Sequence, residues 1–228
     1  MRPDIQALLF DLDGTLIDSM PHHHDAWVLW HEKRGLSLDG DAFFAATAGR
    51  SNAEILGDML PGASAAEIDA MADEKEALYR SIAARSLALI AGARAFVTLA
   101  RDAGLRLAVC TASTPQNMAL AFERFQIDTW VETVVSPADG LRGKPHPDIF
   151  LEAARRLNVP AASCLVFEDA PLGIEAARRA AMPAFALTTT LPAEAFAAYP
   201  NLIGIAADFS GLDLSVLTQQ QHERQHHA

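Results

Sequence analysis

The stretch FDLDGTLIDS, residues 10–19, places two carboxylates two positions apart at the end of an apolar run. Residues 5–10 are rich in branched and aromatic side chains, which is typical of a buried strand, and Gly14 supplies the turn that ends it. Because side chains alternate along an extended chain, we expect Asp11 and Asp13 on one side. Carboxylates this close raise each other's pKa unless a cation neutralises them, so the pair predicts a divalent metal, and oxygen ligation favours Mg²⁺.

Two ordinary structures share the Asp-x-Asp-Gly pattern. An Asp-Gly pair is common in turns, and the four-residue pattern also occurs in calcium loops between two helices. A calcium loop needs further oxygen ligands and a Glu at its twelfth position, whereas here Leu16 and Ile17 are apolar and the twelfth residue is His22. The calcium loop is therefore excluded by spacing, and a plain turn stays open on this motif alone.

Three further motifs follow in order, and with them the chain resembles the haloacid dehalogenase superfamily from residue 5 to about residue 217. Each of these motifs has an ordinary alternative when it is taken alone. A threonine after a strand is usually a helix cap, and a lysine before proline is usually a solvated loop charge. A Glu-Asp pair can be the acidic first turn of a helix. The order and spacing of all four motifs favour the superfamily. The motifs are Asp11 with Asp13, Thr111 after the apolar run 107–110, Lys144 in GKPHPDIF, and Glu168 with Asp169 after the run 164–167.

The resemblance implies an α/β fold: a Rossmann-like doubly wound parallel sheet core with an inserted all-helical cap. In such a sheet, strand ends converge where strand order reverses. Asp11 would be the nucleophile that forms an aspartyl phosphate, and Asp13 the general acid and base. The implied phosphate-binding residues are Thr111, Ala112 and Lys144. The implied metal ligands are Asp11, the Asp13 backbone carbonyl and Asp169, with Glu168 as their support or an alternative ligand.

The same motifs set a condition on charge and narrow the chemistry. Asp11 is an anion that must attack another anion, so Lys144 and the metal have to offset the repulsion. Relatives that remove halide typically lack the second aspartate, and phosphonate-cleaving relatives carry a small residue there, whereas this chain keeps Asp13. Phosphate-ester chemistry is therefore favoured. Thr114 and Pro115 read as the cap and first position of a helix whose free N–H groups face anions.

An inserted helical region separates the first motif from the rest of the core. Helical periodicity occurs in pieces separated by Gly and Pro, and we expect a helical cap at 17–91 and a core formed by 1–16 and 92–228. A cap of this kind can close over the substrate and exclude water, with hinges near 16–20 and 87–93.

Three cap residues match the substrate-facing positions of β-phosphoglucomutase-like and sugar phosphatase-like relatives: His23, Arg50 and Lys75. Arg50 follows Gly49 directly, whereas mutases place their arginine later, and this departure counts against a mutase. The alternative for Lys75 and Arg50 is a solvated surface charge. Successive histidines do not share a helix face, so we expect one to face substrate and two to face solvent. Three aromatic residues are expected to pack the cap: Trp27, Trp30 and Tyr79.

Composition narrows the partners. The 228 residues carry a formal net charge of -11 without basic runs, which argues against nucleic acid and anionic membranes as partners. No signal peptide or spanning segment is recognised, so we expect a cytoplasmic monomer or weak dimer with a small phosphorylated substrate. Cys110 and Cys164 lie in apolar strand patterns and are expected to be buried thiols. The polar end, residues 219–228, reads as a frayed tail, with metal binding by its histidines as an alternative.

The expected core alternates strands and helices, which predicts a parallel sheet. Our leading hypothesis is a Mg²⁺-dependent phosphatase acting on a sugar phosphate through Asp11. Two alternatives stay open: a phosphosugar mutase with the same core, and a non-catalytic binding protein. The expected strands are 5–10, 106–110, 132–135, 163–167 and 183–187, and the expected core helices are 92–103, 115–125, 147–157 and 171–180.

Overall fold

A parallel sheet of six strands forms the centre of the computed structural model, which describes residues 4–47 and 50–218. The strand order is β3-β2-β1-β4-β5-β6, so the order reverses between β1 and β4. The five expected strands are present with bounds within two residues of those expected, and a sixth, β6, was missed. The strands are β1 (Ala7–Phe10), β2 (Arg106–Cys110), β3 (Thr133–Val135), β4 (Cys164–Glu168), β5 (Ala184–Leu187) and β6 (Leu202–Ala206).

The two faces of the sheet bury different side chains, because residues alternate along each strand. One face carries large aromatic groups, and the rings of Phe10 and Phe167 stack with centroids 5.2 Å apart. The opposite face carries small residues such as Ala108, Cys110 and Cys164. Both cysteines are buried and free, as expected. Small side chains let helices approach that face closely.

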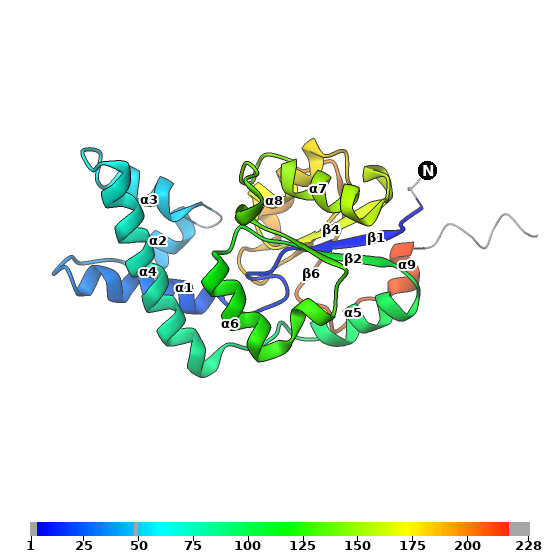
Figure 1. Ribbon diagram of the computed structural model, residues 1–228, viewed down its shortest axis with the longest axis horizontal. Coiled ribbons are helices and arrows are strands. Elements are labelled where there is room, and N and C mark those ends of the chain that lie inside the picture. The colour runs from blue at the N-terminus through cyan, green and yellow to red at the C-terminus, as the bar shows by residue number, and fades with distance from the viewer. Residues whose placement is uncertain (1–3, 48–49, 219–228) are drawn as a thin grey trace, which may run out of the picture.

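Helices cover both faces, which makes the sheet doubly wound as predicted (Figure 1). α7 and α8 lie on one side, and α5, α6 and α9 on the other. Helices α5 to α8 match the expected ranges within about one residue. The helices are α5 (Ala93–Asp102), α6 (Pro115–Phe125), α7 (Asp148–Leu157), α8 (Pro171–Arg179) and α9 (Leu214–Thr218), with 3-10 turns η1 (Ile127–Thr129), η2 (Pro137–Asp139), η3 (Ala161–Ser163) and η4 (Ala193–Phe196).

Residues 20–86, here called the helical lobe, project from one end of the sheet (Figure 1). α3 and α4 each begin with a serine capping box. Trp27 and Trp30 pack against Ile55 and Leu56 in a core of the lobe's own, as expected for these tryptophans. The four helices of the lobe are α1 (Met20–Glu32), α2 (Gly40–Thr47), α3 (Asn52–Met59) and α4 (Ala65–Ser86).

The two connections between lobe and core lie side by side. The Asp18 amide donates to the Ala88 carbonyl at 2.9 Å, and the Ile90 amide donates to the Leu16 carbonyl at 3.0 Å. The expected hinge segments are therefore joined to each other by backbone hydrogen bonds. The second connection is therefore held against the segment that directly follows the first motif.

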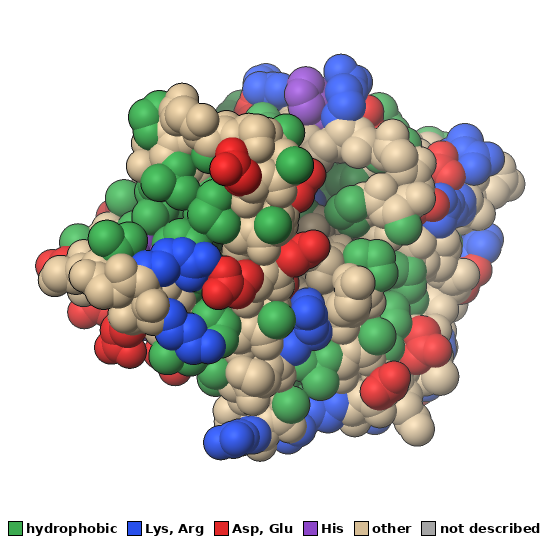
Figure 2. All heavy atoms as spheres, turned by 60° about the vertical axis from the view of Figure 1, so that its left-hand side comes forward, with side chains coloured by type: hydrophobic (Ala, Val, Ile, Leu, Met, Phe, Trp, Pro, Cys, Tyr) green, Lys and Arg blue, Asp and Glu red, His purple; other side chains and the backbone are tan. Residues whose placement is uncertain are grey.

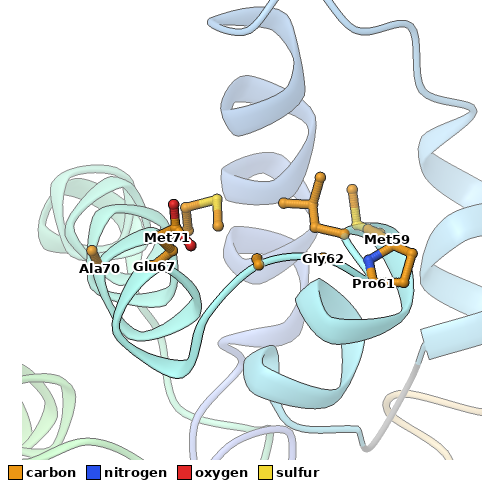
Figure 3. A pocket seen from close by; sticks show the side chains of 8 residues that line it. Met59, Pro61, Gly62, Glu67, Ala70 and Met71 are labelled. Atoms are coloured by element: carbon orange, nitrogen blue, oxygen red, sulfur yellow. The ribbon is translucent and has the colours of Figure 1, made fainter.

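A hollow of about 640 Å³ lies at the tip of the lobe, between the end of α3 and the start of α4 (Figure 3). It is lined mainly by Met59, Leu60, Pro61 and Met71 and contains none of the expected site residues. Among residues 4–47 and 50–218, no helix combines the length and apolar character needed to cross a bilayer. The expected tail, residues 219–228, lies outside the described residues.

Candidate active site

The first and fourth motifs meet where the strand order reverses. β1 and β4 are hydrogen-bonded neighbours, and the Asp11 amide donates to the Phe167 carbonyl at 3.0 Å, so the ladder continues one residue into the motif. Asp11 therefore lies beside Glu168 at the carboxyl edge of the sheet. The Thr111 amide is fixed in the same way by the Val135 carbonyl at 3.0 Å. The strand ladder thus positions three of the four motifs.

Three buried carboxylates converge at this edge. Asp11, Glu168 and Asp169 each offer an oxygen, and these oxygens lie within 4.8 Å of one another. Lys144 enters the cluster and donates to Asp11 Oδ1 at 2.5 Å and to Glu168 Oε1 at 2.6 Å. Its ammonium also donates to the Cys110 carbonyl at 3.2 Å. One ammonium opposes three carboxylates, so the cluster has an excess of negative charge.

The pKa values of these groups reflect that excess. Burial, and then the charge of Glu168, raise the pKa of Asp169 to about 7. Burial also raises the pKa of Asp11, although Lys144 opposes the shift. Burial alone would lower the pKa of Lys144, but Asp11 and Glu168 raise it above its usual value. Closely placed carboxylates with insufficient positive charge fit a divalent cation with oxygen ligands.

Asp169 is held by two threonines that sequence analysis missed. Thr15 Oγ1 donates to Asp169 Oδ1 at 3.1 Å, and Thr190 Oγ1 donates to Asp169 Oδ2. Gly14 lies against the same carboxylate with a φ of +74°, and a Cβ there would be 2.1 Å from Asp169 Oδ2. The glycine is therefore required for both the turn and the space beside Asp169.

Asp13 lies outside the acidic cluster and has its own partners. Ser19 Oγ donates to Asp13 Oδ1 at 2.7 Å, and His23 Nε2 lies 3.8 Å from the same oxygen. Burial alone would raise the pKa of Asp13, but hydrogen bonds and charge from His23, with Ser19 and Ser113, lower it. The Asp13 side chain is therefore not part of the acidic cluster, although it lines the same cavity as Asp11.

The loop after β2 forms one wall of the site. The Thr111 hydroxyl accepts a hydrogen bond from the Ser113 amide at 2.9 Å, which curls the backbone around Ala112. Thr114 then caps α6 by accepting from the Asn117 amide at 3.3 Å, and Pro115 takes the first helical position, as predicted. Thr111, Ala112 and Ser113 all line the cavity that contains Asp11.

Two of the three predicted lobe residues come together above the core site. Lys75 is buried, and its Nζ donates to His23 Nδ1 at 2.7 Å and to Glu76 Oε1 at 3.0 Å. His23 stacks on Tyr79 with ring centroids 3.9 Å apart. The surface-charge alternative for Lys75 is wrong, because this residue and its neighbour Glu76 both lie inside the molecule.

Arg50 occupies a different environment from Lys75. Its Nη2 pairs with Asp58 Oδ2 at 2.6 Å and donates to the Glu54 carbonyl at 3.3 Å, and the side chain is 34% exposed. It lines the same cavity as Asp11 and Lys75. Arg50 is therefore a partly exposed residue of the cavity wall that is paired with Asp58, and its contact with a substrate stays a prediction.

A cavity of about 690 Å³ lies between the sheet edge and the helical lobe and contains every predicted site residue. Its volume fits a small metabolite. On the face shown in Figure 2, acidic and basic side chains are interspersed, and neither sign forms a continuous patch. The cavity walls include Asp11, Asp13, His23, Arg50, Lys75, Thr111, Ala112, Lys144, Glu168 and Asp169.

Known proteins are similar to this chain in sequence and in fold. Validoxylamine A 7'-phosphate phosphatase of Streptomyces hygroscopicus subsp. limoneus is 31% identical over 192 residues, 84% of this chain and 90% of the relative. Fructose-1-phosphate phosphatase YqaB of Escherichia coli (strain K12) is 34% identical over 184 residues, 78% of this chain and 94% of the relative. The crystal structure of β-phosphoglucomutase from Clostridium difficile superposes with a TM-score of 0.78 at 25% identity, over 93% of this chain and 95% of that chain.

The family assignment follows from sequence and fold together. The haloacid dehalogenase-like hydrolases match residues 5–181, which contain all four motifs and the helical lobe. The resemblance drawn from the motifs is thereby confirmed, as is its kinship with sugar phosphatases and β-phosphoglucomutases. This chain belongs to the haloacid dehalogenase-like hydrolase family and is a phosphatase or phosphomutase of that family.

Proposed function

We propose that the chain is a Mg²⁺-dependent phosphatase that hydrolyses a small phosphorylated metabolite, a sugar phosphate, through an aspartyl phosphate on Asp11. One observation carries the proposal. Asp11 is held by Lys144 at the reversal of the sheet, while Asp13, two residues on, has separate hydrogen-bond partners. The two carboxylates therefore differ in environment, which suits one as nucleophile and the other as proton carrier.

The residues of the chain divide the reaction between them. Lys144, Thr111 and the Ala112 amide would hold the phosphate oxygens while the Asp11 carboxylate attacks phosphorus and the ester bond breaks. Asp13 is ionised in the free site because its pKa is lowered, and the negative charge of a bound phosphate favours its protonated form. Asp13 then gives its proton to the leaving oxygen and later takes one from the water that releases Asp11.

The acidic cluster fits a resident Mg²⁺. The Asp11 and Asp169 carboxylates and the Asp13 carbonyl would hold the ion, with Glu168 as support or alternative ligand. When bound, the ion supplies positive charge to the transferring phosphoryl group. Thr15 and Thr190, which hydrogen-bond Asp169, would hold that carboxylate in place for the ion.

The main alternative is a phosphosugar mutase, and the charges in the cavity favour the phosphatase. A mutase returns the phosphate to its substrate and so must bind a sugar with two phosphates. Beyond Lys144, the cationic side chains among the described cavity residues are Lys75, which pairs with Glu76, and Arg50, which pairs with Asp58. Both cations already have a carboxylate partner, which disfavours their binding of a second phosphate.

The lobe completes the proposed enzyme. We propose that residues 17–91 act as a cap that selects the substrate and excludes water, while 1–16 and 92–228 form the core that carries the chemistry. His23, Lys75 and Arg50 would face the part of the substrate beyond the phosphate. The cytoplasmic location, and the monomeric or weakly dimeric state, stay predictions.

The test is phosphate release from a panel of hexose and polyol monophosphates and one aryl phosphate, with Mg²⁺ and with chelator. We expect release that needs the metal and is abolished in Asp11→Asn, because the amide cannot act as the nucleophile. An isomerised sugar phosphate without free phosphate would support the mutase. No turnover of any substrate by the wild type would support the non-catalytic binding protein.

A further inference from the structure

A buried polar contact joins the helical lobe to the core far along the chain from either connection. Glu76 on α4 and Asn117 on α6 are both buried. Asn117 Nδ2 donates to Glu76 Oε2 at 2.6 Å, across a sequence separation of 41 residues. The contact connects a lobe helix to a core helix, and sequence analysis singled out neither residue.

Both ends of the Asn117 amide are used. Its Oδ1 accepts a hydrogen bond from Arg80 Nη1 at 3.0 Å, while its Nδ2 serves Glu76. Glu76 and Arg80 are four residues apart and so lie on one face of α4. Asn117 itself is fixed in the first turn of α6, where its backbone amide donates to Thr114 Oγ1. A single core side chain is therefore clamped by two lobe side chains one helical turn apart.

From Glu76 a series of polar contacts leads to Asp13. Glu76 Oε1 accepts from Lys75 Nζ at 3.0 Å and from Asn52 Nδ2 at 2.6 Å. Lys75 in turn donates to His23 Nδ1, and His23 Nε2 faces Asp13 Oδ1 at 3.8 Å. The series starts in the core at Asn117, crosses the lobe and returns to the core at Asp13.

Burial makes this series sensitive to the position of the lobe. If α4 moves away from α6, the Glu76 carboxylate loses a donor, and the Asn117 amide loses both of its partners at once. A buried hydrogen bond to a charged group contributes far more than an exposed one. The remaining donors to Glu76 would then be Lys75 and Asn52. The contact between Lys75 and His23 would no longer be linked to α6 through Glu76 and Asn117.

We propose that Asn117 is a positioning residue that holds the helical lobe on α6 and, through Glu76 and Lys75, sets the orientation of His23 beside Asp13. The inference rests on the proposed function for its catalytic readout. Asn117 does not act on the substrate. Its role is to place His23 beside Asp13, the proton carrier, only when the lobe is packed against α6.

The test compares two Asn117 variants of the whole chain with one matched control, and adds Glu76→Gln alone and combined with Asn117→Ala. Asn117→Ala removes both side-chain contacts. Asn117→Asp has the same size and keeps the acceptor for Arg80, but it replaces the donor with a carboxylate that faces Glu76. The matched control is Arg124→Ala, because Arg124 Nη1 donates to the Ala84 carbonyl at 3.1 Å and joins the same two helices at an exposed position away from the polar series.

We expect both Asn117 variants to lower kcat for metabolite phosphates by about 10- to 100-fold, the range for loss of one buried hydrogen bond to a charged group. Arg124→Ala should stay within about twofold of wild type, as surface contacts usually do. Adding Glu76→Gln to Asn117→Ala should cost at most about another twofold, since coupled residues are not additive. Amide hydrogen exchange across residues 73–83 should rise in the Asn117 variants and not in the control.

Four outcomes would overturn the inference: Asn117→Asp behaving like wild type, Arg124→Ala losing as much kcat as Asn117→Ala, the Asn117 and Glu76 effects multiplying, or amide hydrogen exchange staying unchanged in the Asn117 variants. Hydrogen exchange separates this inference from the proposed function. If the wild type releases no phosphate, the proposed function fails, while unchanged exchange in the Asn117 variants would still overturn the link between lobe and core.

Discussion

Two buried lysines, Lys144 in the core and Lys75 in the helical lobe, show how the two regions treat charge differently. Lys144 contacts two carboxylates, Asp11 and Glu168, with a third nearby, and its pKa is raised. Burial lowers the pKa of Lys75, and its single carboxylate partner, Glu76, offsets this only in part. The core is therefore short of positive charge, whereas the lobe is close to balanced.

The difference follows from what holds each site. In the core, the backbone hydrogen bonds between β1 and β4 fix Asp11 and Glu168 beside each other, although the two carboxylates repel each other. In the lobe, polar side chains on α1, α3 and α4 hold one another through side-chain hydrogen bonds rather than through a strand ladder. A site with excess negative charge suits a bound cation, which can in turn offset the charge of a phosphate, and a balanced site suits contact with uncharged parts of a substrate.

The largest expected effect comes from removing the core lysine. Lys144→Met leaves Asp11 and Glu168 facing each other without a cation and should lower kcat/KM for every phosphate ester by at least about 1000-fold. It should also lower the free energy of unfolding without metal by about 3 kcal/mol, because it leaves unpaired buried charge. Thermal unfolding with and without Mg²⁺ measures this, and the metal should raise the Tm more in the variant than in wild type.

Lys75→Met is the matched change in the lobe. We expect it to lower kcat/KM for sugar phosphates by about 10- to 100-fold, because His23 and Glu76 both lose a charged partner. The loss on an aryl phosphate should be smaller, because an aryl leaving group depends less on a proton from Asp13. If Lys144→Met and Lys75→Met lowered kcat/KM for the aryl phosphate equally, the two lysines would not differ in role.

The convergence of the core motif residues could be predicted from the sequence, because they follow strand ends at recognisable spacings. Asp11, Thr111 and Glu168 each come directly after an apolar strand or at its last residue, so the parallel sheet brings them together. Thr190 could not be found in this way. It lies in a loop after β5 and is one of three successive threonines, and nothing in its spacing distinguishes the one that reaches Asp169.

Other features were missed for different physical reasons. β6 is half exposed, and Gly204 interrupts its apolar pattern, so it lacks the signal of a buried strand. Glu76 follows Lys75 directly, and adjacent helical residues ordinarily point to different sides, which hides a buried pair. Asn117 reads from sequence as an ordinary first-turn residue of a capped helix, because its partner Glu76 is brought to it only by tertiary packing.

A second core prediction concerns the space beside the fourth motif. Gly173 lies in the first turn of α8, and a Cβ there would be 1.9 Å from Glu168 Cδ and Oε1. Gly173→Ala should displace Glu168 from Lys144 and lower kcat by about 100-fold, the cost of a misplacement of about 1 Å in an active site. Steady-state kinetics on the aryl phosphate tests this, with circular dichroism as the folding control. Wild-type activity would show that Glu168 can move without consequence.

A smaller effect is expected at the rim of the cavity. Arg50→Ala removes a half-exposed ion pair with Asp58, which contributes at most about 1 kcal/mol to stability. We expect a rise in KM of about three- to tenfold for sugar phosphates and little change in kcat, as for loss of uniform binding. Arg34→Ala is the control, since Arg34 pairs with Glu74 in the same lobe and does not line the cavity. A rise in KM of the same size in both variants would assign the Arg50 effect to lobe stability.

The smallest expected effect is that of an added methyl group in the lobe, at Gly57, compared with the same change in the core, at Gly173. Gly57 lies inside α3, and a Cβ there would meet only Ile68 Cδ1, at 4.0 Å. Gly57→Ala should therefore raise the free energy of unfolding by about 0.5–1 kcal/mol, because alanine has the better helix propensity and fewer unfolded conformations, and leave kcat and KM unchanged. Urea unfolding beside Gly173→Ala makes the comparison direct. Both changes add one methyl group to a helix. Equal loss of activity in the two variants would mean that activity is as sensitive to packing at Gly57 in the lobe as at Gly173 in the core.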